Sequence, residues 1–259
     1  MKKLFFVIKM IGLTIAGLDP SGGAGVLTDI KTFSALGIHG TCVITNLTAQ
    51  NPDKVYGIKE IDTDFISLQF DSLLNEYPIK YGKTGMLYSK DIVKLVSDKI
   101  VENELNIIID PVMIASSGSN LSDNNYSKYL KKYLIPNGIL VCPNVNEAEK
   151  LSGIKINNLE DGIKAAEKIG KKSNIIITGG HLNGKSILYD GDIKIYNQEL
   201  IKTDNTHGSG CTFSAAVCGY LIKNHDLRKS IEKSNEYVYN SIKYCRYKTL
   251  NPLYKLNNK

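Results

Sequence analysis

Segments with the periodicity of strands alternate with segments of helical periodicity along most of this 259-residue chain. Ile11–Ala16 has the pattern of a strand, and a helical segment at 25–36 follows it. A nearly continuous apolar run at 107–112 is typical of a strand that is covered on both faces. We therefore expect a mostly parallel sheet between two layers of helices, a three-layer α/β/α sandwich. The remaining strands are expected at 41–47, 79–86, 139–142 and 175–178, and the remaining helices at 64–74, 91–101, 126–134, 147–151 and 162–169 and from near 210 and 227.

A dipeptide predicts a small antiparallel hairpin in addition to the parallel strands. Asp190-Gly191 lies between two strand-like segments, Ser186–Tyr189 and Asp192–Tyr196, and Asp-Gly favours a tight hairpin turn. No linker or internal repeat is evident, and the length suits one large α/β domain. We expect a single domain over 1–259, with an extra N-terminal segment at 1–9 and a frayed tail at 249–259.

The net charge of +6 is concentrated near the C-terminus. Five of the 32 basic residues, and none of the 26 acidic ones, lie from Lys243 onward, so the rest of the chain is nearly neutral. We therefore expect no nucleic-acid-binding face, which would need a basic stripe on the fold itself. We also expect no membrane span, because no stretch reaches roughly 18 uninterrupted apolar residues.

The five cysteines are scattered, and no two of them form a C-x-x-C pair. An odd, unpaired set argues against a disulfide framework or a structural zinc site and favours a reducing, cytoplasmic compartment. The apolar run after Met1 resembles a signal peptide, but Lys9 interrupts it. We therefore expect a cytoplasmic protein.

The segment Asn205–Cys211 (N-T-H-G-S-G-C) connects a strand-like region to a helix. A Gly-rich loop that runs into a helix N-terminus presents unpaired backbone N–H groups and the positive end of the helix dipole. Such a loop binds anions, and phosphate is the usual one. Because Cys211 lies at the helix start, we expect the pKa of its thiol to be lowered, so that the sulfur can accept a proton.

Further polar or Gly-rich segments follow the other expected strands. Ligands of open α/β sheets bind outside the carboxyl ends of the strands, so segments at these positions together indicate a site. The segments are Gly17–Gly25, Thr48–Asn51, Gly85-Met86, Asp110-Pro111 with Ser116–Ser119, Pro143–Glu147, and Gly179–His181. Asp29, one turn into the helix after the first of them, is either a solvated carboxylate or an acceptor for a substrate hydrogen bond.

Asn144 and Glu147 lie three residues apart at the start of an expected helix. A capping box, in which each side chain bonds the other's backbone N–H, is a sufficient explanation for this pair. The alternative is a ligand set for Mg²⁺, which proteins usually hold through one or two carboxylates, waters and phosphate oxygens. Asp110, a lone acid at the end of an apolar strand, is the candidate for the second carboxylate.

A series of motifs, in order along the chain, resembles the hydroxymethylpyrimidine/phosphomethylpyrimidine kinases of thiamine biosynthesis, within the ribokinase-like superfamily. The resemblance runs from about Ile11 to Tyr239, and the Q-N after the second strand and the final Cys of N-T-H-G-S-G-C distinguish this family from sugar kinases. The motifs are L-T-I-A-G-L-D, P-S-G-G-A-G, D-I-K-T-F-S-A-L-G, V-I-T-N-L-T-A-Q-N, G-M-L, D-P-V-M, P-N-V-N-E-A-E, G-G-H-L, Y-D-G and N-T-H-G-S-G-C.

The resemblance implies an ATP- and Mg²⁺-dependent kinase and a role for each matching residue. Gln50 would bond the aminopyrimidine edge, and the residues expected to line the pocket around it are Gly17, Ala24, Asp29, Thr48 and Met86. Gly208, Ser209 and Gly210 would cradle the transferred phosphate, and Cys211 would take the proton of the substrate hydroxymethyl group. Asp110 and Glu147 would organise Mg²⁺, and the nucleotide side would include Asn144, Glu147, Thr178 and Gly180. The resemblance also implies a small-molecule substrate and a homodimer.

This chain departs from the family pattern at two positions. Thr178 replaces the usual Lys before Gly-Gly-His, and Ser116 replaces the usual Lys after D-P-V-M. Both positions belong to the nucleotide side of the family's site. The sequence therefore specifies the phosphate donor less fully than it specifies the pyrimidine pocket. The alternatives to a pyrimidine kinase are a pyridoxal- or pyridoxine-type vitamin kinase on the same fold and a non-catalytic sensor of pyrimidine phosphates.

Overall fold

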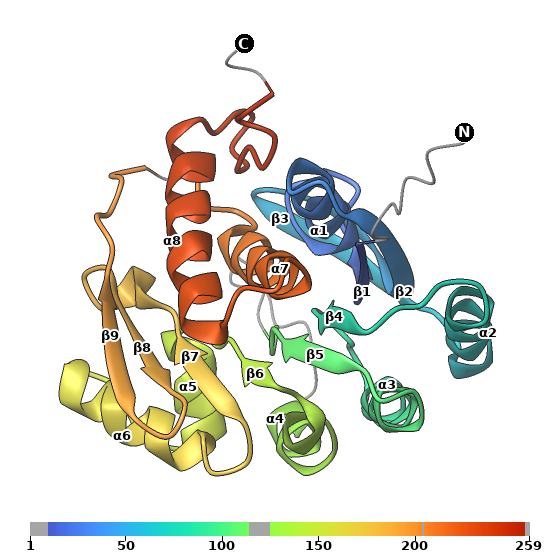
Figure 1. The fold of residues 1–259 in the computed structure, drawn as a ribbon, viewed down its shortest axis with the longest axis horizontal. Helices are drawn as coiled ribbons and strands as arrows, with labels where there is room; N and C mark the ends of the chain where they lie inside the picture. Colours follow the sequence, from blue (N-terminus) through green and yellow to red (C-terminus); the bar gives the residue numbers. More distant parts are fainter. Residues whose placement is uncertain (1–9, 114–124, 204, 257–259) are drawn as a thin grey trace, which may run out of the picture.

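The computed structural model describes residues 10–113, 125–203 and 205–256, which form one nine-stranded sheet flanked by helices (Figure 1). The strands are β1 (Ile11–Leu18), β2 (His39–Asn51), β3 (Lys54–Glu60), β4 (Tyr81–Thr84), β5 (Asn106–Ile109), β6 (Leu140–Val141), β7 (Asn174–Ile177), β8 (Lys185–Tyr189) and β9 (Ile193–Asn197). The α-helices are α1 (Gly25–Ala35), α2 (Thr63–Leu74), α3 (Lys90–Glu102), α4 (Tyr126–Tyr129), α5 (Val145–Ser152), α6 (Leu159–Ile169), α7 (Ser209–Ile222) and α8 (Leu227–Lys243).

The strand order is β3-β2-β1-β4-β5-β6-β7-β8-β9. The six strands from β2 to β7 in this order pair in parallel. Antiparallel strands complete both edges, with β3 on β2 and the β8–β9 hairpin on β7. The expected mostly parallel sheet and the hairpin at Asp190-Gly191 are both confirmed.

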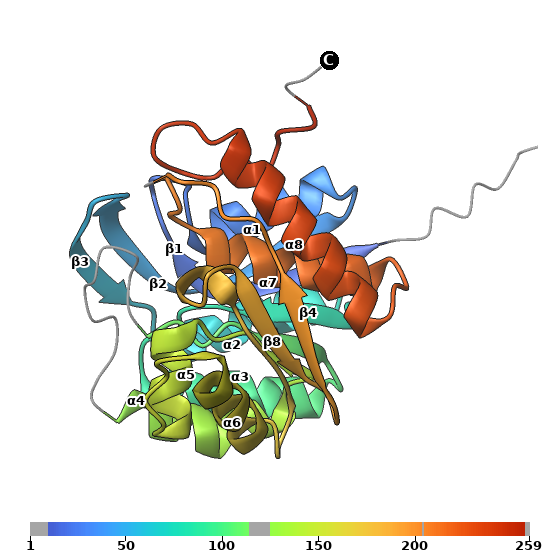
Figure 2. The same cartoon turned by 90° about the vertical axis from the view of Figure 1, so that its left-hand side faces the viewer.

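Helices cover both faces of the sheet (Figure 2). Helices α1, α7 and α8 lie on one face, and α2, α3, α5 and α6 lie on the other. Strand β5 shows why its sequence is apolar without alternation. Ile107 and Ile109 enter the core under α2 to α6, whereas Ile108 enters the core under α7 and α8, and all three are fully buried. The sequence pattern thus reports burial on two faces.

Strand β3 was not predicted from the sequence. It pairs with the end of β2, which extends to Asn51, beyond the expected end at 47. No residue of β3 is buried, so its side chains have no apolar alternation that would reveal a strand. An edge strand of this kind is held by its ladder of backbone hydrogen bonds rather than by a core face.

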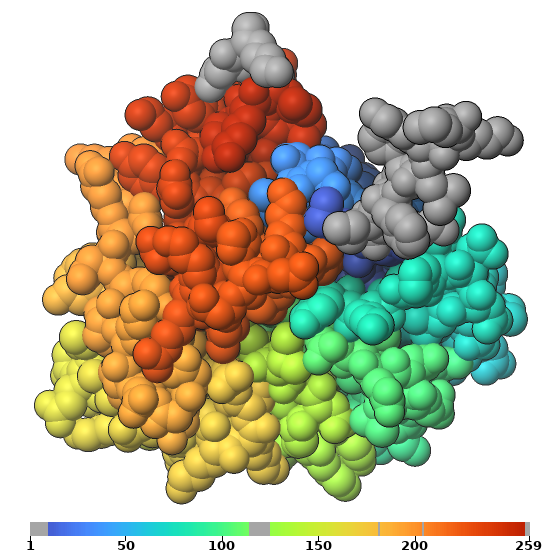
Figure 3. All heavy atoms as spheres, in the orientation of Figure 1, coloured from blue at the N-terminus to red at the C-terminus, as the bar shows by residue number. Residues whose placement is uncertain are grey.

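Segments from the two ends of the chain pack together beside the sheet. Helix α7 contacts both α1 and α8, and the space-filling view shows the orange and red C-terminal residues against the blue N-terminal ones (Figure 3). This packing places the start of α7 next to the loop after β1. Within the described residues, no helix has both the length and the apolar composition needed to cross a bilayer.

Candidate active site

A cavity of about 750 Å³ opens at the edge of the sheet where the parallel strands end. Because the carboxyl ends of parallel strands meet at one edge, loops far apart in the sequence converge there. The expected site residues that line the cavity are Gly17, Ala24, Thr48, Gln50, Met86, Asp110, Asn144, Glu147, Thr178, Gly180, Gly208, Ser209, Gly210 and Cys211. Ser116 lies outside the described residues.

The Gly-rich loop before α7 has the backbone that the sequence suggests. Gly208 is the N-cap residue and has a left-handed conformation, with φ 87° and ψ 7°. A Cβ atom at Gly208 would lie 1.8 Å from the carbonyl oxygen of Gly23, so the two loops approach too closely for any side chain. Gly210 faces open space, and the first-turn N–H groups of a helix have no acceptor within the helix. Residues 208–210, termed here the glycine cradle, therefore bring the start of α7 and its backbone to the cavity.

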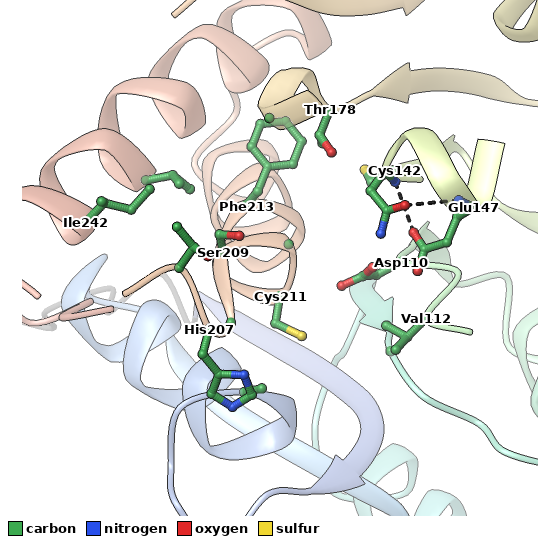
Figure 4. A pocket seen from close by; sticks show the side chains of 18 of the residues that line it. Asp110, Val112, Cys142, Glu147, Thr178, His207, Ser209, Cys211, Phe213 and Ile242 are labelled. Atoms are coloured by element: carbon green, nitrogen blue, oxygen red, sulfur yellow. Dashed lines mark hydrogen bonds between the residues drawn. The ribbon is translucent and has the colours of Figure 1, made fainter. Parts of the chain in front are cut away.

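Cys211 lies in the first turn of α7 and faces the cavity between His207 and Asp110 (Figure 4). The side chain is partly exposed and lines the cavity. Burial raises the pKa of the Cys211 thiol; Lys83 and the N–H of Gly25 act in the opposite direction without cancelling this effect. The expectation of a lowered thiol pKa is therefore wrong, because desolvation outweighs the helix terminus.

Asp29 is the expected pocket residue that the structure places elsewhere. Helix α1 turns its side chain toward the sheet, where it is fully buried and does not line the cavity. Its carboxylate accepts a hydrogen bond from Thr14 Oγ1 at 2.6 Å and pairs with Lys83 Nζ at 3.2 Å. Asp29 thus lies behind the cavity wall, which corrects the expectation that it contacts the substrate.

Lys83 is a buried cation that the sequence analysis did not identify. It lies on β4 in the middle of the sheet, is 0% exposed, and pairs with Asp29 at 3.2 Å and Asp110 at 3.5 Å. These two carboxylates raise the pKa of Lys83 although burial alone would lower it, so the side chain is charged. The available signal was a lysine in the middle of an expected strand, since a buried charge needs a partner.

Asp19 and His207 form a second pair that joins the loop after β1 to the loop before α7. His207 Nε2 lies 3.0 Å from Asp19 Oδ2, and the backbone N–H of Ala24 donates to the same oxygen at 2.9 Å. Burial opposes the charge on Asp19, but hydrogen bonds, including those with His207 and Gln50, lower its pKa. An ionised Asp19 accepts from Nε2 of His207 and fixes the orientation of the imidazole.

Asp110 and Glu147 face each other across the cavity wall (Figure 4). Asn144 and Glu147 form the complete capping box at the start of α5, with both hydrogen bonds at 3.0 Å. Burial and the neighbouring charge of Asp110 raise the pKa of Glu147 to about 8. The capping interpretation of Asn144 and Glu147 is confirmed. The carboxylates of Asp110 and Glu147 also lie close enough to each other to disfavour simultaneous ionisation.

The end of the cavity near Thr178 also includes segments that the sequence did not indicate as part of a site. Thr178 and Gly180 lie there, as expected, beside residues that follow β9 and residues from α8. No sequence signal marks this end, because the α8 residues belong to an ordinary amphipathic helix. The additional lining residues are Gln198, Glu199, Leu200, Ile201, Thr203, Asn235, Val238, Tyr239 and Ile242.

Comparison with known proteins gives one consistent result. Residues 19–253 match the family model described as phosphomethylpyrimidine kinase. The chain is 39% identical over 242 residues to the hydroxymethylpyrimidine/phosphomethylpyrimidine kinase of Aquifex aeolicus, covering 90% of this chain and 94% of that protein. It is 37% identical to the thiamine biosynthesis bifunctional protein ThiED of Geobacter sulfurreducens, where it covers 90% of this chain but only 49% of the larger protein.

Solved structures with the same fold include a phosphomethylpyrimidine kinase and pyridoxal kinases. A phosphomethylpyrimidine kinase from Clostridium difficile has a TM-score of 0.80 at 34% identity, over 90% of this chain and 100% of that one. An ADP complex of Bacillus subtilis pyridoxal kinase has a TM-score of 0.83 at 36% identity, over 90% of this chain and 92% of that one.

Proposed function

This chain belongs to the phosphomethylpyrimidine kinase family, and we propose that it uses ATP to phosphorylate 4-amino-5-hydroxymethyl-2-methylpyrimidine and then the resulting monophosphate, in thiamine biosynthesis. The observation that carries the proposal is one cavity with Gln50 at one end, Thr178 at the other and the glycine cradle between them. A phosphoryl donor and an acceptor bound at the two ends would meet over the cradle.

The end of the cavity near β1 and β2 is the proposed pyrimidine site. Gln50 is a planar amide that pairs donor to acceptor with an aminopyrimidine edge. Its neighbour Asp19 is ionised and hydrogen-bonded, which restricts the orientation of the amide. The remaining wall is formed by small or apolar groups, which suit an aromatic ring: Gly17, Ala24, Thr48 and Met86.

Phosphoryl transfer depends mainly on positioning and on stabilisation of charge on the transferring group. The backbone N–H groups of Gly208 and Gly210 supply that stabilisation in this proposal, while the N–H of Ser209 donates to the carbonyl of Thr206 at 3.1 Å and so holds the loop in place. Cys211 supplies the proton acceptor. The Cys211 thiol first releases its proton to water. The alcohol O–H bond then breaks as the oxygen attacks phosphorus, the proton moves to the thiolate of Cys211, and the bond between phosphorus and ADP breaks.

The other end of the cavity is the proposed nucleotide site. Thr178, Gly180 and Asn144 lie toward the phosphates, and the partly buried face of α8 with Val238 and Ile242 provides an apolar surface for a base. Thr178 lacks the charge of the usual lysine, so this chain relies more on backbone N–H groups and on a cation to neutralise the phosphates.

The carboxylates of the cavity wall fit a magnesium ion. Burial and then the charge of Asp110 raise the pKa of Glu147, so a cation bound between the two carboxylates would favour their charged forms. Hydrogen bonds from Lys83 and Ser214 both reach Oδ2 of Asp110, and Asp110 still lines the cavity. We propose that Asp110 and Glu147 hold Mg²⁺ through water and phosphate oxygens, where it would neutralise phosphate charge.

A pyridoxal-type vitamin kinase is the second candidate function. It is favoured by the similarity of this chain to a pyridoxal kinase at 36% identity. A non-catalytic sensor of pyrimidine phosphates is the third, because Thr178 lacks a lysine charge. A coupled assay of ADP release with a panel of aminopyrimidine alcohol, pyridoxal and sugar separates the three. We expect the highest kcat/KM for the aminopyrimidine, whereas a preference for pyridoxal or no turnover would overturn the proposal.

We also propose that the protein acts as a homodimer in the cytoplasm. Strand β3 is an edge strand, and the exposed side chains near it include Leu47 and Tyr56, at 39% and 66% exposure. An exposed sheet edge with apolar side chains is a common site of association. The free cysteines suit a reducing compartment. Light scattering on a size-exclusion column would measure the mass of the assembly.

Replacement of Gln50 by leucine tests the pyrimidine site. An unpaired polar edge costs roughly 1–3 kcal/mol, so Gln50→Leu should raise the KM for the pyrimidine about 5- to 150-fold and leave the KM for ATP nearly unchanged. Gln198→Leu makes the same change at the other end of the cavity and should not alter the pyrimidine KM. Equal effects of Gln50→Leu on both substrates would remove Gln50 from the pyrimidine site.

Replacement of Glu147 by glutamine tests the proposed metal site. Glutamine can keep the capping box, so Glu147→Gln should preserve the melting temperature while lowering kcat and raising the Mg²⁺ concentration needed for half-maximal rate by roughly tenfold or more. Glu149→Gln, on the same helix but outside the cavity lining, is the control. An unchanged Mg²⁺ dependence would leave Glu147 as a capping residue only.

A further inference from the structure

A tight turn near the end of the chain contacts three loops around the pyrimidine end of the cavity. In this turn, residues 246–249, Arg246 and Thr249 exchange both backbone hydrogen bonds, at 3.1 and 3.0 Å. Thr249 Oγ1 also donates to the carbonyl of Arg246 at 3.0 Å. The structure describes all four residues of the 246–249 turn, and none of them lines the cavity. Any effect of the turn on a substrate must therefore pass through the loops that it contacts.

The first contacts of the turn are with the loop before α7 and the loop after β1. Thr249 forms a parallel β-bridge with His207, the residue that precedes the glycine cradle. A Cβ atom on Gly23 would lie 2.5 Å from Thr249 Cγ2 and 2.6 Å from His207 Cδ2. The carbonyl of Gly23 in turn closely approaches Gly208. Thr249, His207 and Gly23 thus meet at one point beside the cradle.

The next contact is with the loop between β2 and β3. Lys248 Nζ lies 2.7 Å from Asp53 Oδ2, across 195 positions of the chain. Both side chains are exposed, and an exposed ion pair contributes little stability. The pair shows instead where the turn lies, because Asp53 follows β2, the strand that carries Gln50. The turn therefore contacts the segment that carries Gln50 as well as the one that carries the cradle.

The chain that follows the turn is anchored on the helices. Leu250 and Tyr254 are buried, and Tyr237 of α8 donates to the carbonyl of Pro252 at 2.5 Å. Helix α8 ends just before the turn. The turn is therefore held on both sides, so that its position relative to the three loops is fixed.

The backbone of the turn is strained. Tyr247 and Lys248 have φ 53° and 62°. The two central residues of a type I′ turn need such left-handed values, and Asn-Gly usually supplies them. Tyr247 is 92% exposed, so burial of its side chain does not account for the conformation. Strain of this kind persists where the surrounding structure determines it, and it gathers at functional sites.

We propose that the 246–249 turn is a positioning element for phosphoryl transfer, in which Thr249 holds His207 against the loop after β1 and so fixes the glycine cradle relative to the pyrimidine end of the cavity. The kinetic part of this inference rests on the proposed function. The pair of Asp19 and His207 transmits the effect, because Asp19 Oδ2 lies 3.0 Å from His207 Nε2 and accepts from the N–H of Ala24. A displaced His207 would therefore shift both the cradle and the Ala24 wall of the pyrimidine site.

Thr249→Pro tests this role, because proline lacks the N–H that bonds Arg246 and so opens the turn. Thr249→Ala is a milder variant that keeps the backbone bonds and shortens the side chain, and it decides the test if the proline variant does not fold. Lys248→Gly is the matched control. Glycine accepts the left-handed backbone, so this variant should keep the turn, raise the melting temperature and lose only the exposed ion pair.

The first readout does not depend on turnover. Hydrogen exchange of residues 205–211, followed by peptide mass mapping, reports local opening of the loop before α7. Exchange should be roughly tenfold faster in Thr249→Pro, faster by a smaller factor in Thr249→Ala and unchanged in Lys248→Gly. Native exchange in the proline variant, or in Thr249→Ala if the proline variant does not fold, would overturn the proposal, because the turn would then not hold the loop.

The second readout is the kinetic profile with the aminopyrimidine, measured well below the melting temperature. Thr249→Pro should lower kcat and raise the pyrimidine KM, each roughly tenfold, because the cradle and the pyrimidine end lose their alignment. The ATP KM should change less. A turn with only a structural role would lower the melting temperature and leave kcat and both KM values native, and that result would also overturn the proposal. If the native protein itself fails to phosphorylate the pyrimidine, the proposed function fails, but the exchange comparison still decides whether the turn holds the loop.

Discussion

Replacing Cys211 by alanine is expected to lower kcat by roughly two to four orders of magnitude, the usual contribution of a positioned proton acceptor. Binding of pyrimidine and ATP should be retained, because the cradle is formed by backbone groups that alanine also provides. Steady-state kinetics with binding titrations of both substrates would measure the two effects separately. Cys218→Ala, a buried thiol on the same helix outside the cavity lining, is the matched control.

Cys211→Asp extends this prediction. A carboxylate restores a proton acceptor and should recover part of the lost rate. The limb of the pH–rate profile that reports the acceptor should move to lower pH, because the ordinary pKa of aspartate, about 3.9, is far below that of cysteine, about 8.5. If Cys211→Ala turns over at the native rate, the thiol is only a packing residue, and the backbone cradle alone stabilises the transition state.

Gly208→Ala is expected to lower kcat by roughly 10²-fold, since a displacement of about 1 Å in positioned groups has an effect of this size. Gly208 combines a positive φ with a contact in which a Cβ atom would lie 1.8 Å from the carbonyl of Gly23. One of the two loops must therefore move, and the cradle moves with it. The measurement is kcat at saturating substrates, together with the melting temperature.

Gly153→Ala separates backbone strain from displacement of the cradle. Gly153 has φ 71°, similar to the 87° of Gly208, but a Cβ atom there would meet nothing within 4 Å. Both variants should lose stability by roughly 1–2 kcal/mol from the left-handed conformation, while only Gly208→Ala should lose turnover. Equal kcat values for the two variants would mean that the close contact with Gly23 does not set the geometry of the cradle.

The layered architecture and the location of the site were predictable from local patterns. Apolar runs without alternation, such as 107–112, indicate strands covered on both faces, and the strand ends then define one edge for a ligand. Strand β3 was not predictable in this way, because no residue of β3 is buried. The formation of β3 depends on its pairing with β2, and this pairing is a property of the folded structure rather than of the local sequence.

The sequence by itself determined which loops converge and that a glycine-rich segment precedes α7, since both follow from periodicity and from the backbone freedom of glycine. Only the tertiary structure decided the chemistry of the charged groups. It paired Asp19 with His207 across 188 positions of the chain, turned Asp29 behind the cavity wall and placed Lys83 beneath its floor. It also reversed the expected pKa shift of Cys211. The reason is that desolvation and charge pairing depend on every atom around a group, and those neighbours come from strands and helices that the local sequence does not specify.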